Sequence, residues 1–171
     1  FTEGGKGNDS LKVNTNSTLE QLILDFDKRI TANTKLFLEF EGELTDNMIG
    51  LYRSRYTEKN SERYMATTQF EATYARRAFP CFDEPACKST FDVTMRIDKD
   101  LQAISNMPVK EEQREGDKKI IVFHTTPKMS TYLLYLCVGK FDFLEGRAGK
   151  IIVRVITTPG KKNQTGLALD L

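Results

Sequence analysis

The residues best suited to chemistry lie at positions 69–85, in the run Q-F-E-A-T-Y-A-R-R-A-F-P-C-F-D-E-P. Within about twenty residues the chain places two prolines, two arginines, two cysteines and three carboxylates, without a helix or strand period. Core packing alone does not produce so irregular a run. We therefore interpret it as a site or a recognition surface.

Gln69 and Glu71 carry the candidate binding chemistry. Because side chains alternate along a strand, these two residues emerge on one face while Phe70 points to the other. A carboxylate presented in this way suits a ligand ammonium, through charge-assisted hydrogen bonds that strengthen where water is excluded. The alternative is structural: Glu71 pairs with Arg76 or Arg77, which follow closely in the chain.

The remaining side chains of the run have structural interpretations. Asp83 and Glu84 fit loop caps or ion-pair partners for the basic residues nearby. Phe79 and Phe82 are typical of core side chains.

The rest of the chain excludes several other catalytic sites. A catalytic zinc needs three protein ligands, usually with two histidines four residues apart on a helix, and the sequence holds only His124. We interpret His124 as a strand histidine that is packed or hydrogen-bonded at a sheet face. No G-x-S-x-G nucleophile elbow, G-x-G-x-x-G loop or Walker loop is present either. The sequence therefore predicts no metal ligands and no catalytic residues within this chain.

Composition narrows the class of protein further. A length of 171 residues suits one domain with a real core, and a net charge of +1 gives no electrostatic bias toward nucleic acid. The longest apolar stretch, residues 133–139, is far shorter than the ~20 residues of a membrane-spanning helix. Three cysteines, with Cys81 and Cys87 at a spacing typical of neither zinc nor disulfide motifs, favour a reduced, cytoplasmic setting. The alternative is a secreted form or a membrane ectodomain, in which the N-x-S/T sequons at Asn8, Asn16 and Asn163 would be glycosylation acceptors. We expect the chain to be cut from something larger, because it has no initiator methionine and ends as an amphipathic pattern begins.

Alternation of apolar and polar residues predicts strands along most of the chain. Residues 36–44 and residues 91–97 alternate, which gives each segment one buried and one solvated face. Many short strands of this kind predict a mainly β fold, an antiparallel saddle-shaped β-sandwich with one or two short helices. Further strands are expected over residues 20–27, 49–56, 63–71, 119–125, 133–144 and 150–158.

Helices and boundaries follow from local signals. Thr73 is expected to cap a short helix that ends at Ala78 before Pro80, and a second helix is expected over residues 164–171. The charged residues 110–119 are expected to form a solvated loop between strands. We expect residues 1–158 to form the β-sandwich domain, and residues 159–171 to be a linker and the first turns leading into a further domain.

Four sequence blocks resemble the amino-terminal domain of the gluzincin zinc aminopeptidases, the family of aminopeptidase N, puromycin-sensitive aminopeptidase and leukotriene hydrolase. The resemblance lies in their order and spacing, and it covers essentially the whole chain, with the first forty residues the least distinctive. The blocks are G-L-Y-R-S-R-Y at 50–56, T-Q-F-E-A-T-Y-A-R-R-A-F-P-C-F-D-E-P at 68–85, K-S-T-F-D-V at 88–93 and T-P-K-M-S-T-Y-L at 126–133.

The resemblance implies a function for two residues. Glu71 matches the family carboxylate that binds the free α-amino group of the substrate, and Gln69 matches the glutamine that lines the pocket for the first side chain. Family members with strong epoxide hydrolase activity carry glutamine in place of this glutamate, so Glu71 implies the plain aminopeptidase branch. The implied partners are the amino terminus of a peptide substrate and the chain's own catalytic domain.

The resemblance also implies zinc as the cofactor of the full-length enzyme. The catalytic domain of the family carries H-E-x-x-H, a distant third glutamate ligand and a G-x-M-E-N loop, and none of these occurs here. Zinc would activate a water there, and Glu71 would fix which peptide bond lies over the metal. The 171 residues alone are expected to hydrolyse nothing. Two alternatives stay open: a stand-alone β-sandwich binding module without peptidase activity, and a nonproteolytic relative with a degraded zinc site.

Overall fold

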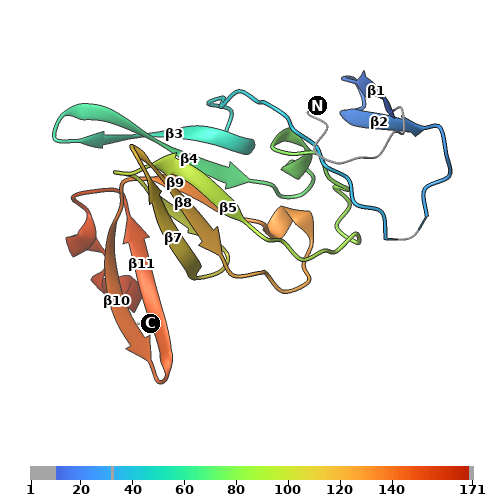
Figure 1. Ribbon diagram of the computed structural model, residues 1–171. Helices are drawn as coiled ribbons and strands as arrows, with labels where there is room; N and C mark the ends of the chain where they lie inside the picture. Colours follow the sequence, from blue (N-terminus) through green and yellow to red (C-terminus); the bar gives the residue numbers. More distant parts are fainter. Residues whose placement is uncertain (1–10, 32, 170–171) are drawn as a thin grey trace.

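A computed structural model describes residues 11–31 and 33–169, together with their side chains except those of residues 167 and 169. In this part of the chain the backbone forms antiparallel sheets and only short helical segments, which confirms the mainly β prediction. Figure 1 shows two central sheets with a hairpin at either end of the molecule. Among the described residues, no helix has the length and apolar content needed to cross a membrane.

The first central sheet has the strand order β3-β4-β9-β6, with every neighbouring pair antiparallel. Lys59 and Asn60 connect β3 to β4, and both have positive φ angles, of 47° and 64°. Positive φ at both central residues is the geometry of the tight hairpin turn whose twist matches the flanking strands. The strands are β3 (Gly50–Glu58), β4 (Ser61–Gln69), β6 (Gln102–Ser105) and β9 (Leu136–Gly139).

The second central sheet has the order β5-β8-β7 and includes β5 (Thr94–Asp98), β7 (Val109–Glu115) and β8 (Lys118–Phe123). The solvated loop expected at residues 110–119 is wrong, because most of this segment pairs with β8 or belongs to it. The sequence of β7, V-K-E-E-Q-R-E, has no alternation of apolar and polar residues, and every residue of the strand is exposed. Its backbone ladder makes it a strand, and its charges suit a sheet edge exposed to water.

Two clusters of buried residues form the core. Ile97, Ile121 and Phe123 of the second sheet pack with Ala103 and Val138 of the first, as expected for a sandwich. The second cluster lies where β4 ends, around the buried residues Phe70, Ala75 and Leu134. This cluster places the run of residues 69–85 directly on the core.

The two outer hairpins are β1 (Leu11–Asn16) with β2 (Gln21–Phe26), and β10 (Asp142–Ala148) with β11 (Ile151–Thr157). They lie at opposite ends of the view in Figure 1. The strand expected over residues 133–144 is divided in the structure between η2, β9 and the start of β10. The helical segments are η1 (Ala75–Arg77), η2 (Thr131–Leu133), η3 (Lys162–Gln164) and α1 (Gly166–Leu169).

The strand expected over residues 36–44 is wrong. These residues run between β2 and β3 without joining a sheet of the described chain, and Thr45 after them forms an isolated bridge with Tyr52 (Figure 1). Phe37 is 79% exposed and Phe40 is 57% exposed. Alternation describes how side chains divide between two faces, but a strand also needs a neighbouring backbone to form a ladder with it.

The helix expected at Thr73 is shorter than predicted. η1 is a 3-10 turn with Tyr74 at its cap position, and no side-chain cap bond comes from that residue. The backbone N–H of Arg76 instead donates to the Asp83 carboxylate at 3.0 Å. A donor satisfied by a residue further along the chain removes the need for a local cap. The second expected helix is α1 preceded by η3, and its last two residues lie outside the described chain.

Candidate functional site

The end of β4 presents Gln69 and Glu71 to solvent on either side of the buried Phe70. Gln69 and Glu71 are exposed, while Phe70 retains 1% of its accessible surface. The expected alternation is therefore present, although β4 itself ends at Gln69 and Glu71 lies in the turn that follows. The Glu71–Ala72 peptide bond is cis. In the part of the chain that the structure describes, the Glu71 side chain makes no hydrogen bond or ion pair.

The turn after Glu71 is compact and closely packed. The backbone N–H of Tyr74 donates to the carbonyl of Phe70 at 2.9 Å, and that of Arg77 donates to the carbonyl of Tyr74 at 3.2 Å. Ala75 in this turn has no exposed surface. Gly50, which pairs with Gln69 across β3 and β4, lies so near the turn that an added Cβ would meet the Cβ of Arg77 at 3.0 Å.

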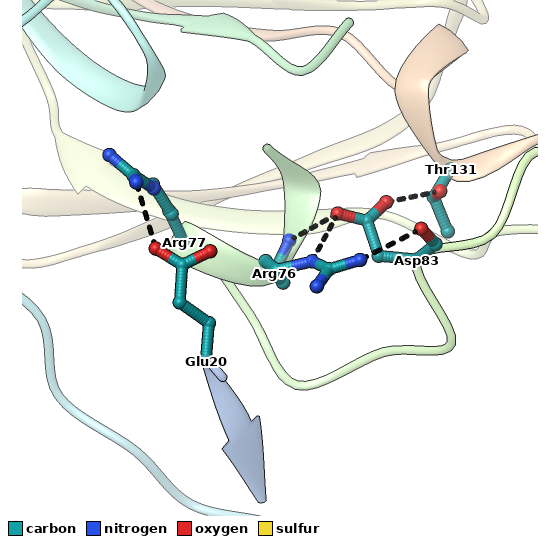
Figure 2. Close-up of polar contacts among 5 residues, drawn as sticks. All are labelled: Glu20, Arg76, Arg77, Asp83 and Thr131. Atoms are coloured by element: carbon teal, nitrogen blue, oxygen red, sulfur yellow. Dashed lines mark hydrogen bonds and ion pairs between the residues drawn. The ribbon is translucent and has the colours of Figure 1, made fainter. Parts of the chain in front are cut away.

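Arg76 is held by Asp83, not by Glu71. The Asp83 side chain is only 2% exposed, and its Oδ2 accepts both the backbone N–H of Arg76 at 3.0 Å and the guanidinium Nε at 3.3 Å. The other carboxylate oxygen accepts the Thr131 hydroxyl at 2.7 Å. Figure 2 shows Asp83 between these two partners. The interpretation of Asp83 as an ion-pair partner for a nearby base is confirmed.

Arg77 is held by Glu20, which lies in the turn between β1 and β2. Its guanidinium forms an ion pair with the Glu20 carboxylate, with Nη2 2.8 Å from Oε1, and lies over the Tyr74 ring, 5.2 Å from the centroid. The two guanidinium groups point in different directions in Figure 2, each toward its own carboxylate. The structural alternative in which Glu71 pairs with Arg76 or Arg77 is therefore not what the structure shows.

The aromatic residues of the run divide between core and surface. Phe79 packs edge-on against Phe70, with ring centroids 5.9 Å apart, so its assignment to the core is confirmed. Phe82 is 85% exposed, and its assignment to the core is wrong. The reason is position: Phe82 lies in the loop directly before Asp83, and that residue takes the inward position. Half-burial of Cys81 raises the pKa of its thiol to about 11, with the Asp83 carboxylate adding to the effect and Arg76 opposing it.

Sequence reasoning missed the partners that come from distant segments. Glu20 and Thr131 lie 57 and 48 residues from Arg77 and Asp83 respectively. No local spacing links either pair, because each contact depends on how the sheets are arranged. His124 follows β8 and is exposed, with its backbone N–H donating to the Pro108 carbonyl. No group of three or more potential metal ligands is found among the described residues.

The fold and the exposed residues Gln69 and Glu71 define an antiparallel β-sandwich domain with a polar surface at the end of one strand. Comparison with protein families identifies the family of this domain. The chain belongs to the family of the Peptidase M1 N-terminal domain, whose model matches residues 2–133.

Similar proteins carry aminopeptidase names. The puromycin-sensitive aminopeptidase of Caenorhabditis elegans is 42% identical over 176 aligned residues, which cover 100% of this chain and 19% of the relative. Aminopeptidase 2, mitochondrial, of Saccharomyces cerevisiae is 48% identical over 82% of this chain and 15% of the relative. The probable aminopeptidase 2 of Sulfurisphaera tokodaii is 44% identical over 80% and 17%. The chain thus spans no more than about a fifth of the length of these relatives.

Proposed function

We propose that this chain is the substrate-anchoring, amino-terminal domain of a zinc-dependent aminopeptidase that removes amino-terminal residues from peptides. The observation that carries the proposal is the state of Glu71. This exposed carboxylate follows a strand of the core sheet, and both neighbouring arginines are paired with other acids. A carboxylate without a cation of its own is available for a ligand ammonium.

In this proposal Glu71 accepts hydrogen bonds from the free α-ammonium of a peptide, and Gln69 lines the pocket for the first side chain. Holding the terminal ammonium at a fixed point determines which peptide bond reaches the catalytic groups, and it excludes internal segments of a chain. The buried Phe70 between them supports the required precision, because it fixes the backbone from which both polar residues project.

The described residues do not fit a zinc site, since they contain no group of potential ligands large enough to hold the metal. Zinc ligands and catalytic groups would therefore belong to a catalytic domain outside these 171 residues. That domain would be part of the same full-length protein and would pack against this one. We propose residues 1–158 as the β-sandwich domain and residues 159–171 as the connection to it. On this assignment the isolated 171 residues have no peptidase activity.

The free cysteine thiols support a cytoplasmic location for the protein. Cys81, Cys87 and Cys137 are all free, which fits a reducing compartment such as the cytoplasm.

A stand-alone binding module is the weaker proposal. A domain that functions alone in water is expected to cover its large apolar side chains. Phe82, Phe37 and Met48 are 85%, 79% and 66% exposed. These surfaces favour a domain that is covered by other parts of a longer protein.

The proposal is tested by Glu71→Ala and Glu71→Gln in the full-length enzyme, assayed on an aminoacyl substrate with a free amino group. We expect kcat/KM to fall by an amount equivalent to about 2 to 4 kcal/mol of transition-state stabilisation, because a charge-assisted anchor is lost. Glu111→Gln is the matched control, since Glu111 is an exposed carboxylate on β7. Unchanged kinetics in both Glu71 variants would remove the assignment.

A further inference from the structure

The Asp83 carboxylate is buried at the centre of the contacts that hold the turn after Glu71. Its side chain is 2% exposed, and all three donors that reach it come from elements on either side of the loop. A carboxylate is costly to bury unless such donors satisfy it. Removing this one residue therefore releases several contacts together.

The contact between Asp83 and Arg76 is connected to Glu71 through the backbone of the turn. Asp83 binds the N–H of Arg76, and Ala75 before it is completely buried. The N–H of Tyr74 in turn donates to the carbonyl of Phe70, the residue before Glu71. The five residues from Glu71 to Ala75 are thus held at both ends.

The contact between Asp83 and Thr131 is connected to the sheet that carries Gln69. Asp83 accepts the Thr131 hydroxyl, and the neighbouring Ser130 hydroxyl donates to the Pro85 carbonyl at 2.6 Å. The chain continues from η2 into β9, which pairs with β4. The Leu136 N–H also donates to the Thr68 hydroxyl at 3.0 Å, one residue before Gln69.

Asp83 also binds Arg76, the first cationic residue after Glu71 in the sequence. The Arg76 guanidinium donates through Nε to the carboxylate and through Nη2 to the Asp83 carbonyl at 3.2 Å. Figure 2 shows this group directed along the loop toward Asp83. A guanidinium held by two acceptors in this way does not compete with a ligand ammonium for Glu71.

We propose that Asp83 is a positioning residue for the substrate amino terminus: its buried carboxylate fixes the turn that carries Glu71 and keeps Arg76 away from it. The inference rests on the proposed function, since it specifies how Glu71 is kept available for the ammonium. Asp83 itself touches no substrate.

The test measures amine preference in the full-length enzyme. The probes are leucine hydroxamate and 4-methylpentanoic hydroxamate, which differ only in the α-amino group, and the readout is the ratio of their inhibition constants. A general loss of structure weakens both probes alike, whereas a displaced Glu71 weakens only the probe with the amino group. Glu71→Gln sets the scale, and we expect it to lower the preference about tenfold to a hundredfold.

We expect Asp83→Ala to lower the preference toward that of Glu71→Gln. Asp83→Asn is expected to retain most of it, because the amide oxygen can accept from the Arg76 N–H while the amide donates to the Thr131 hydroxyl. Thr131→Val, which removes one of the donors, is expected to have an intermediate effect. Asp100→Ala is the matched control, an exposed aspartate in the turn after β5.

The outcomes separate the two proposals. If Glu71→Gln leaves the preference unchanged, the proposed function fails. If Glu71→Gln lowers it while a folded Asp83→Ala variant keeps the wild-type preference, the positioning role alone is overturned. Should Asp83→Ala fail to fold, an unchanged preference in Thr131→Val overturns the role in the same way.

Discussion

At the scale of single residues, burial decides which polar groups of the run meet solvent. Glu71 and Asp83 are both carboxylates in the same short segment, yet one is exposed without a partner among the described residues and the other is enclosed by three donors. Exposure leaves the Glu71 carboxylate accessible for the ligand ammonium that we propose, whereas the enclosed Asp83 carboxylate is held by protein donors. Both side chains end in a carboxylate, so the different roles that we propose for them rest on their environments.

Cys81 provides a pH test of this environment. Burial raises the pKa of its thiol from an ordinary 9.0 to about 11, so the folded state favours the neutral form. The unfolded thiol ionises at lower pH than the folded one. Its contribution to stability is therefore fully present below pH 9 and is lost as the pH rises through about 11. We expect the denaturant midpoint of the 171-residue chain to fall across this window.

The Cys81→Ala variant should lose less stability across the same window. Some loss is expected to persist, because burial also raises the pKa values of Cys137, Tyr56 and Tyr135. Cys87→Ala is the control, since Cys87 is exposed and its replacement should leave the alkaline loss as in the wild type. Equal losses in wild type and Cys81→Ala would contradict the burial argument.

The sequence predicted the local part of this site and missed the distant part. The exposed-buried-exposed order of Gln69, Phe70 and Glu71 follows from the two-residue period of an extended chain, which is a local property. The pairing of Arg77 with Glu20 depends on the position of the β1–β2 hairpin, and no local pattern encodes that position. The prediction that Phe82 lies in the core is wrong for the same reason, because composition does not reveal which loop residue turns inward.

At the scale of elements, the contact between β3 and the turn after β4 requires a glycine. Gly50 has a φ angle of 70°, which L-residues adopt at a cost, and an added Cβ would lie 3.0 Å from the Arg77 Cβ. This close approach brings the start of β3 against η1. The contact thus links the β3–β4 ladder to the segment that follows Glu71.

We expect Gly50→Ala to destabilise the chain more than Gly149→Ala. Gly149 also has a positive φ, of 61°, but an added Cβ there meets nothing within 4 Å. The backbone term of about 1 to 2 kcal/mol is common to both variants, so any further loss in Gly50→Ala measures the packing of η1 on β3. Urea denaturation of the two variants measures their unfolding free energies. Equal losses of unfolding free energy would show that η1 and β3 accommodate the added Cβ without loss of stability.

Element prediction succeeded where alternation and pairing coincide. β2, β3, β5, β8 and β11 lie within the expected segments or within a few residues of them, and each forms a ladder with a neighbouring strand. Residues 36–44 alternate without joining a sheet of the described residues, and β7 joins a sheet without alternating. A ladder partner is a property of the tertiary fold, so the sequence pattern of one segment cannot supply it.

At the scale of the whole molecule, the described chain combines a packed sandwich with large exposed apolar side chains. The buried clusters connect both central sheets and the run of residues 69–85. Phe37, Phe40 and Phe82 lie on the surface, from 57% to 85% exposed. Phenylalanine therefore occupies two environments, and its contribution to the stability of this chain should differ sharply between them.

Phe70→Ala and Phe82→Ala test this division within one run of sequence. Phe70 is 1% exposed and packs on Phe79, so its truncation leaves a cavity and should cost about 3 to 5 kcal/mol of unfolding free energy. Phe82 is 85% exposed, and its truncation should change the same free energy by no more than about 0.5 kcal/mol. Both values come from denaturant unfolding of the 171-residue chain. A similar loss in the two variants would mean that Phe82 packs against the sandwich, and that the surface at the end of β4 is smaller and more enclosed than its exposure indicates.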